Sequence, residues 1–350
     1  MEVCFLKEKS CNITKTSIGG QALIEGVMMR GPKKSAMTVR NPEGELVIEE
    51  WENKVNSRPK FFKLPVVRGM FNFFDSISAG YKCLMRSAEI AGLEDELEDK
   101  PKKNADQAEG AEAEVAAEPS STSEKDKKAE KKEENSGVMG VLMVISVVLA
   151  LVLAIGLFIV LPTFLGGLLA KNVEVFANSF LRSLFEGVIR LVILVGYLVL
   201  VSLMKDIRRT FQYHGAEHKT IFCYESGLEL TVENVRKQRR FHPRCGTSFL
   251  ILMVIVGIFV SMFIPRSIGG WEMPFYVRSA IKLALLPIIM GVGYELIKLA
   301  GRHDNLFTRI ISAPGTWLQR LTVFEPDDGM IECAIESMKR VIPEDGSDRW

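Results

Sequence analysis

Apolar residues gather in four segments of this chain that are long enough to cross a membrane. The stretch from Gly137 to Leu161 has no charged residue, and its 25 residues, at about 1.5 Å of helical rise each, exceed a hydrocarbon core of roughly 30 Å. Thr247 to Pro265 is a second uncharged stretch of sufficient length. These patterns predict transmembrane helices over residues 137–162 and 247–265.

Two further apolar segments, 185–204 and 279–300, carry charged residues towards their ends. The charged residues are Glu186 and Arg190 in the first and Lys282, Glu295 and Lys298 in the second. Near a helix end, long basic side chains can extend to the interface and acids can reach water, so both segments are predicted to span the membrane. The chain is therefore expected to be an α-helical polytopic membrane protein with about four transmembrane helices. The alternative is two spans and two buried helices.

Basic residues are concentrated in one of the segments that connect the predicted spans. Residues 205–246 contain nine Lys and Arg residues, whereas the loops between the other spans contain few. Lys and Arg are retained on the cytoplasmic side of a membrane. This asymmetry predicts that the loop 205–246 and both termini are cytoplasmic.

Outside the spans, the pattern predicts a small α+β cytoplasmic portion. Alternating residues in AMTVR and ELVIEEW, joined by the turn sequence NPEG, predict a β-hairpin within residues 1–92. An amphipathic helix is predicted from Leu64 to Gly92, and its apolar stripe is expected to pack in a core or, alternatively, to lie in the plane of a membrane. The segment GGQALIEGVMMRGP does not match a phosphate-binding loop and is expected to be a structural turn.

The remaining polar segments are a linker and a tail. Residues 93–136 consist mainly of Glu, Asp, Lys, Ala and Ser, a composition that predicts disorder. The tail, residues 301–350, contains a helix predicted over Asp327–Arg340 and is expected to dock on the cytoplasmic face. The N-terminus lacks the apolar region of a secretory signal, and a net charge of +1 gives no indication of nucleic-acid binding. Six cysteines without a CxxC pair predict no structural disulfide in a reducing compartment.

Three of the four histidines lie close together in the sequence and form the best candidate for chemistry. In HGAEH, His214 and His218 are four residues apart, so on a helix their imidazoles share one face and can share one metal ion. His242 and Cys245, from the sequence HPRC before the third predicted span, are the candidate third and fourth ligands. Glu217 lies beside these ligands and is the candidate catalytic residue. The alternative is a surface helix without a metal and a cysteine that is simply buried.

The spacing of HGAEH is also that of the zinc motif of inverzincin peptidases, in which the glutamate serves as general base. Those enzymes take a further glutamate from a distant helix as third ligand. Glu295 is the candidate counterpart here, with an ion pair to Lys298 or a simple interfacial charge as the alternatives. Beyond these five residues nothing resembles a peptidase, so the sequence favours a convergent pattern.

Four separated blocks, taken together, resemble a known family. GGQALIEGVMMRGP, YHGAEHKTIFCYE, ELTVENVRKQRRFHPRCGTSFL and PGTWLQRLTVFEPDDGMIECAI are similar to the bacterial YqhQ-like family, and they occur in the same order. That family is one of unknown function, described as membrane proteins and predicted metal-dependent enzymes. The resemblance implies a bacterial inner membrane location, metal positions at His214, His218 and His242, and an acid/base role for Glu217.

Three hypotheses about function follow. The first is a divalent-metal-dependent enzyme, a hydrolase with an unknown substrate at the inner face of the membrane, with zinc as the expected ion. The second is a non-enzymatic scaffold in which a closed metal site, completed by Cys245, attaches the cytoplasmic loop to the third span. The third is a transporter, which is least favoured because the spans carry few polar residues at mid-bilayer. The expected partner is the lipid bilayer, and no nucleic acid is expected.

Overall fold

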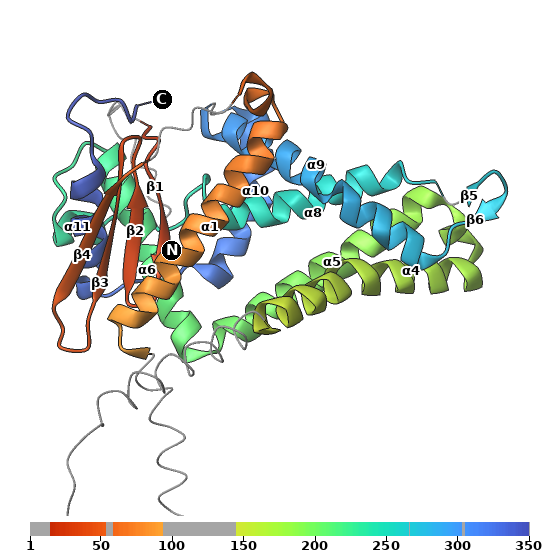
Figure 1. The fold of residues 1–350 in the computed structure, drawn as a ribbon, viewed down its shortest axis with the longest axis horizontal. Coiled ribbons are helices and arrows are strands. Elements are labelled where there is room, and N and C mark those ends of the chain that lie inside the picture. Colours follow the sequence, from red (N-terminus) through yellow and green to blue (C-terminus); the bar gives the residue numbers. More distant parts are fainter. Residues whose placement is uncertain (1–14, 54–58, 94–144, 266, 303–304, 350) are drawn as a thin grey trace, which may run out of the picture.

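The computed structural model describes residues 15–53, 59–93, 145–265, 267–302 and 305–349. The predicted linker, apart from its first residue, and the start of the first predicted span lie outside these residues. Figure 1 shows a four-stranded sheet with helices on both faces at one end of the molecule, and long helices that run side by side away from it.

The sheet is an antiparallel meander in which each strand pairs with the next one along the chain. Its strands are β1 (Gly19–Leu23), β2 (Gly26–Arg30), β3 (Lys34–Arg40) and β4 (Leu46–Glu52). β3 and β4 form the hairpin predicted around NPEG, where Gly44 has a φ of 88° that favours glycine. The segment GGQALIEGVMMRGP, expected to be a structural turn, instead forms β1 and β2.

Helices make up most of the described chain. The longer ones are α1 (Val67–Ile90), α4 (Leu161–Asn172), α5 (Ser179–Ser202), α6 (Lys205–Glu225), α8 (Gly246–Met262), α9 (Phe275–Arg302), α10 (Leu306–Thr322) and α11 (Asp328–Val341). The short elements are η1 (Lys60–Lys63), η2 (Gly156–Val160), η3 (Glu174–Ala177), α7 (Val232–Arg236), β5 (Ser267–Ile268) and β6 (Trp271–Glu272). The sequence did not predict α10, because it contains Pro314 followed by Gly315, a pair that usually ends a helix.

Both faces of the sheet are covered, which explains why β2 has a continuous apolar run rather than an alternating one. Val27 and Met29 belong to a core shared with α6 and α11. Met28 belongs to a second core on the other face, together with Cys83 and Leu84 of α1. A strand with this burial carries no period-two signal, and β2 was missed for that reason.

The apolar stripe of α1 packs in a core only in part, since Leu84 packs against the second core beside Cys83. Phe74, Ile77 and Tyr81 are exposed. The buried positions are held by small side chains, at Gly69, Gly80, Cys83 and Ser87. These residues allow close approach, since a Cβ on Gly80 would lie 2.1 Å from the Gln21 side chain. The prediction of core packing therefore holds at Leu84, whereas Phe74, Ile77 and Tyr81 of the same stripe face outward.

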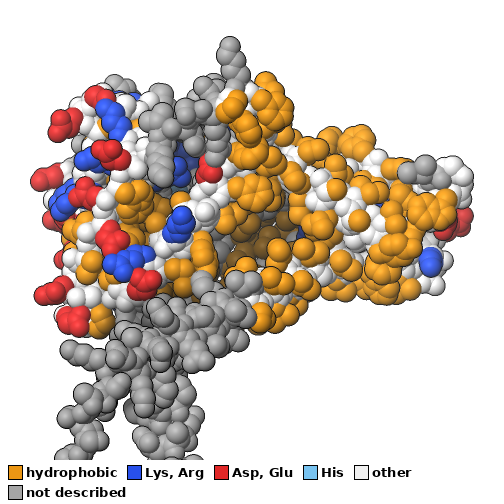
Figure 2. Space-filling view, in the orientation of Figure 1, with side chains coloured by type: hydrophobic (Ala, Val, Ile, Leu, Met, Phe, Trp, Pro, Cys, Tyr) orange, Lys and Arg blue, Asp and Glu red, His pale blue; other side chains and the backbone are white. Residues whose placement is uncertain are grey.

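Three helices are long and apolar enough to cross a membrane. They are Ile145–Asn172, which includes η2 and α4, Ser179–Ser202, and Phe275–Ala300 within α9. At the remaining predicted span, α8 is shorter, with 17 residues. Figure 2 shows apolar side chains covering this part of the molecule, while charged side chains gather over the sheet end and at the far tip. The chain is thus a membrane protein with three candidate spans in the part that the structure describes.

Charged residues in the candidate spans turn inward. Glu186 of α5 is 1% exposed and pairs with Lys282 of α9, whose amine also donates to the Thr163 hydroxyl at 2.9 Å. Arg182 Nε donates to the same carboxylate at 3.1 Å. Arg278 is fully buried, and two of its nitrogens have no hydrogen-bond partner among the described residues. The expectation that Glu186 and Lys282 extend to the interface is wrong, because both side chains are buried and form one ion pair.

Candidate metal centre

Helix α6 carries HGAEH and packs against the sheet. It is a separate helix rather than a continuation of α5, because the chain leaves helical geometry between the two, at Met204, which is extended. Gly215 allows the Phe324 carbonyl to approach α6, since a Cβ there would lie 2.0 Å from that oxygen. A glycine at this position thus lets the backbone of residue 324 pack closely against α6.

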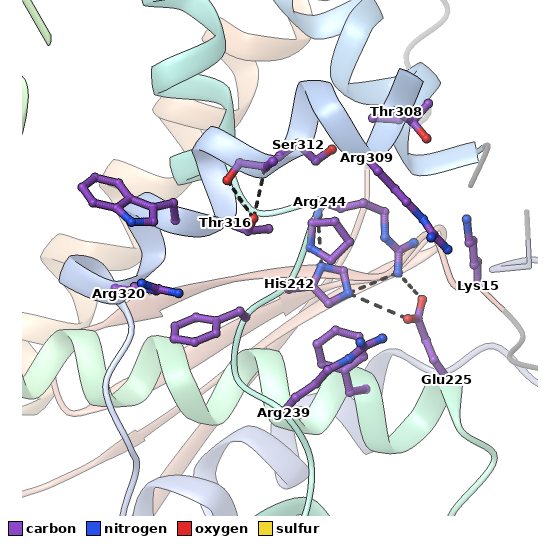
Figure 3. A pocket seen from close by; sticks show the side chains of 16 residues that line it. Lys15, Glu225, Arg239, His242, Arg244, Thr308, Arg309, Ser312, Thr316 and Arg320 are labelled. Atoms are coloured by element: carbon purple, nitrogen blue, oxygen red, sulfur yellow. Dashed lines mark hydrogen bonds and ion pairs between the residues drawn. The ribbon is translucent and has the colours of Figure 1, made fainter. Parts of the chain in front are cut away.

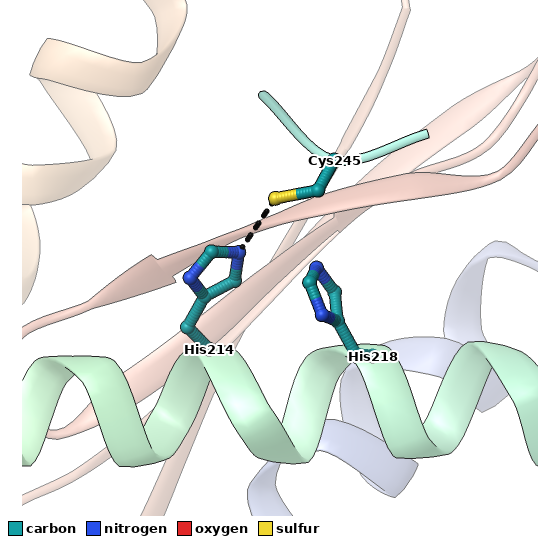
Figure 4. Close-up of side chains that lie close together, drawn as sticks. All are labelled: His214, His218 and Cys245. Carbon is teal, nitrogen blue, oxygen red and sulfur yellow. Dashed lines mark hydrogen bonds between the residues drawn. The ribbon is translucent and has the colours of Figure 1, made fainter. Parts of the chain in front are cut away.

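Three donor side chains converge above α6 (Figure 4). His214 and His218 lie on one face of the helix, and their ring centroids are 4.4 Å apart. Cys245 comes from the N-cap of α8, and its Sγ lies 3.1 Å from His214 Nε2. One donor atom from each of these residues lies within 4.8 Å of the others. Two imidazole nitrogens and one sulfur are thus close enough to bind one ion.

A backbone carbonyl holds each of these histidines at Nδ1. His214 Nδ1 lies 2.9 Å from the Thr322 carbonyl oxygen, and His218 Nδ1 lies 2.6 Å from the Arg240 carbonyl oxygen. A carbonyl only accepts hydrogen bonds, so Nδ1 carries the proton in both rings and Nε2 is left as the ligand atom. Burial lowers the pKa of His218, which keeps the ring in the neutral form that binds metals.

The sulfur of Cys245 lies where a thiolate is stabilised. Burial acts to raise the pKa of this thiol, but the adjacent His218 ring and the hydrogen bonds from Thr247 act in the opposite direction, and the pKa is lowered overall. The Thr247 backbone N–H donates to Sγ at 3.4 Å, and the Thr247 hydroxyl lies at 3.2 Å. Because the thiolate is the form of cysteine that binds metal ions, these contacts favour ligation.

Glu217 is buried beside the three donors. It accepts a hydrogen bond from the Gly20 backbone N–H of β1, while its Oε2 has no hydrogen-bond partner among the described residues. Burial raises the pKa of Glu217 to about 7, although the charge of His214 and the Gly20 hydrogen bond act in the opposite direction. A Cβ on Gly20 would lie 2.8 Å from Glu217 Cγ, so glycine is needed there. Strand β1, from the segment GGQALIEGVMMRGP, therefore packs against Glu217 through Gly20, a residue without a side chain.

The three donors and Glu217 line one cavity of about 540 Å³. Its other walls come from β1, from the start of α8 and from the C-terminal part of α9. A cavity of this size holds a small organic group. A molecule bound in it would therefore contact the three donors and Glu217 directly.

His242, a predicted ligand, does not join the group of three donors. Its Nε2 lies 3.8 Å from Glu225 and 3.3 Å from the Arg244 guanidinium. Gln319 of α10 holds this turn, because its Oε1 accepts from the His242 N–H at 2.8 Å and its Nε2 donates to the His242 carbonyl at 2.7 Å. The structure thus turns His242 towards Glu225 and brings Cys245 to the third donor position.

Glu295, the other candidate third ligand, also lies outside the group. Arg68 of α1 binds its carboxylate with two hydrogen bonds, from Nε at 2.6 Å and from Nη2 at 2.5 Å. This bidentate ion pair joins α1 to α9. Glu295 therefore has a structural contact, an ion pair with Arg68, a partner that the sequence did not indicate.

The donors that the structure brings together fit a zinc-type divalent ion. Zinc binds imidazole nitrogen and thiolate sulfur in four-coordinate geometry, so two histidines and one cysteine leave one position for another ligand. The buried, unpaired oxygen of Glu217 marks a polar group that lacks a partner beside this position. Sequence reasoning missed Gln319, which is indicated only by its place in the block PGTWLQRLTVFEP. It also missed the two backbone carbonyl groups that hold the histidines, because a backbone group cannot be recognised from residue type.

Comparisons with known proteins assign these features to a family. A family model described as "Protein of unknown function (DUF1385)" matches residues 64–344. The chain is 32% identical over 330 residues to "Uncharacterized protein YqhQ" of Bacillus subtilis (strain 168), a match that covers 93% of this chain and 92% of that relative. No solved structure matches. The resemblance carried by the four sequence blocks is thereby confirmed.

Proposed function

This chain belongs to the DUF1385 family of proteins of unknown function, and we propose that it is a divalent-metal-dependent hydrolase of the bacterial cell membrane. His214, His218 and Cys245 would bind a zinc-type ion, and Glu217 would be the base. The observation that carries the proposal is the convergence of these three donors on one cavity, with both histidines held at Nδ1 so that Nε2 faces the sulfur.

The number of donors supports an enzyme rather than a closed structural site. Structural zinc sites are usually completed by four protein ligands, whereas catalytic sites have three and keep one position open. His242 is the remaining ligand that the sequence predicted, and its Nε2 is already engaged by Arg244 and Glu225. A scaffold with a closed site would require that turn to rearrange.

The residues around the ion would divide the chemistry among them. A zinc-type ion bound here supplies Lewis-acid activation of water. The Thr322 and Arg240 carbonyls fix the tautomer and the orientation of the two histidines. Glu217 accepts a proton at its unpaired Oε2, while the Gly20 N–H holds the other carboxylate oxygen in place.

The proposed topology has four spans and two cytoplasmic termini. The 17 residues of α8 extend about 25 Å at roughly 1.5 Å each, near the lower limit for a span, and the apolar residues Phe263–Pro265 lengthen this third crossing. The nine basic residues of 205–246 support a cytoplasmic position for the loop that carries HGAEH. The metal centre would then lie at the cytoplasmic membrane face.

Reporter fusions test this topology. Fusions after Arg240 and after Arg340 should both give a cytoplasmic signal, because basic loops are retained on that side. A fusion after Asn172, between the first two spans, is the control and should give an extracytoplasmic signal. An extracytoplasmic signal after Arg340 would separate the C-terminal helices from the proposed compartment and reject the orientation.

Metal content tests the ligands. The purified full-length protein should contain about one divalent ion per chain, and Cys245→Ser and His214→Ala should each lose it, because both remove a ligand atom. His242→Ala is the comparison variant and should keep most of the metal. The measurement is elemental analysis, with thermal unfolding to show that each variant is folded. Equal metal loss in His242→Ala and His214→Ala would restore His242 as a ligand, and a metal-free, active wild-type protein would reject the proposal.

A further inference from the structure

A second cavity, of about 850 Å³, adjoins the metal centre (Figure 3). It lies between the end of α6, the segment 239–244 and one side of α10. His242 and Arg244 line both this cavity and the one that contains the three donors. A molecule bound in the larger cavity therefore lies next to the metal centre, with one turn of the chain between them.

The charged side chains around the larger cavity are mostly basic. They are Lys15, Arg239, Arg244, Arg309 and Arg320, against one acid, Glu225. Arg239, Arg244 and Arg320 against this one carboxylate leave an excess of two positive charges, because burial lowers the pKa of His242 and keeps it neutral. Such an excess attracts anions.

The arginines differ in how far they are already neutralised. Glu225 forms an ion pair with Arg244, so the charge of Arg244 is already neutralised by another residue that lines the cavity. Arg239 stacks on the Phe222 ring, with its guanidinium carbon 4.6 Å from the ring centroid. Neither Arg239 nor Arg320 forms an ion pair with a carboxylate in the described part of the chain. Their guanidinium groups are therefore available to donate hydrogen bonds to an anion in this cavity.

Helix α10 presents an apolar face beside the same cavity. Leu306, Ile310 and Trp317 are exposed and, at spacings of four and seven residues, lie on one side of the helix. Trp317 also lines the cavity, so the apolar face and the basic wall meet at this side chain. α10 packs against α8 and α9, which places this helix beside the membrane-type helices (Figure 1).

We propose that this cavity binds a phosphate-type anion and that the anion is the head group of a membrane lipid. Arginine binds phosphate oxygens through two parallel hydrogen bonds, which suits Arg239 and Arg320. The apolar face of α10 accommodates the acyl chains, and basic pockets beside spans on the cytoplasmic side bind anionic head groups. The proposal that the cavity binds a lipid phosphate does not depend on the hydrolase proposal. The further statement that lipid phosphates are the substrate class rests on the proposed function.

The test uses purified full-length protein in detergent, freed of lipid and treated with a chelator. Dihexanoyl phosphatidic acid, dihexanoyl phosphatidylcholine and inorganic phosphate are titrated in separate experiments, and binding is measured by native mass spectrometry and tryptophan fluorescence. Phosphatidic acid should bind at least about tenfold more tightly than either other probe, because it alone combines an uncapped phosphate with acyl chains.

Variants locate the binding site. Arg239→Gln/Arg320→Gln should weaken phosphatidic acid binding by about tenfold for each arginine removed. Arg340→Gln is the control, because Arg340 is an exposed arginine of α11 outside the cavity. The affinity of this variant for phosphatidic acid should match that of the wild type. If the glutamine variant does not fold, Arg239→Lys/Arg320→Lys keeps the charge, removes the bidentate geometry and should bind about tenfold more weakly than wild type.

Three results would overturn the proposal. Equal affinities for phosphatidic acid and inorganic phosphate would reject the lipid as the carrier of the anion. Equal affinities for phosphatidic acid and phosphatidylcholine would reject the anion site. Unchanged binding in a folded Arg239→Gln/Arg320→Gln variant would place the lipid elsewhere. Because the metal has been removed and no turnover is measured, these results are independent of the metal analysis that tests the proposed hydrolase.

Discussion

Glu217→Gln should leave the protein folded and metal-loaded but lower its activity by about 10²- to 10⁴-fold, the usual contribution of a positioned general base. The amide keeps the shape of the carboxylate, and its oxygen can still accept the Gly20 N–H that holds β1 over the site. The substitution removes the ability to take up a proton. Activity is measured as complementation of a strain that lacks its own copy, and as turnover of an ester or phosphodiester probe that the wild-type protein hydrolyses.

Glu229→Gln is the matched control for this experiment. Glu229 is an exposed glutamate after α6 and does not line the cavity of the metal centre. Its variant should match the wild type in activity, metal content and melting temperature. In a scaffold with a structural metal, Glu217 would only orient a ligand, so the amide should be tolerated or should lower metal content and function together. Full activity of a metal-loaded Glu217→Gln protein would reject Glu217 as the base.

The features of the site that depend on a single helix were predictable from the sequence. His214 and His218 are neighbours because the α-helical repeat brings residues four apart to one face, whatever the rest of the chain does. The helix predicted over 327–340 is found at Asp328–Val341, because an acidic N-cap and an apolar repeat define it locally. Both signals lie within a few turns of chain.

A single helix could not show whether His242 or Cys245 lies beside His214 and His218. The two residues are three apart in one turn, and either side chain is a suitable zinc ligand. Gln319, 77 residues further along the chain, holds the turn at both backbone groups of His242. That contact requires α10, a helix that was not predicted because of its internal proline. A local pattern therefore does not encode which side chain faces His214.

The inward-facing charges of the candidate spans have the same explanation. Hydropathy treats each charged residue by itself, so Glu186 and Lys282, which lie in two different predicted spans, were each expected to extend to the membrane interface. The structure pairs them across 96 positions of sequence, and Thr163 from a third helix accepts a hydrogen bond from the same amine. Only the packing of α4, α5 and α9 brings these groups together.

Glu186→Gln should lower the free energy of unfolding by about 3–5 kcal/mol, because it removes one partner from a buried ion pair and leaves Lys282 and Arg182 without their carboxylate. The packing of α4 leaves little room for water to replace it, since a Cβ on Gly166 would lie 2.6 Å from Glu186 Cγ. Unfolding of the full-length protein in mixed micelles, driven by added denaturing detergent, gives the free energy. Glu174→Gln, at an exposed residue of η3, is the control and should change it by less than about 0.5 kcal/mol.

A second substitution separates the loss of charge pairing from a general packing defect. Lys282→Met in the Glu186→Gln background removes the second member of the pair, so fewer uncompensated charges remain buried. The double variant should therefore be more stable than Glu186→Gln alone, although Arg182 still lacks its partner. If the two changes simply add, the ion pair does not stabilise this bundle. If Glu186→Gln is as stable as the wild type, the buried cations are neutralised by another anion. Such an anion would lie near Arg278, which is fully buried and has two nitrogens without a partner in the described chain.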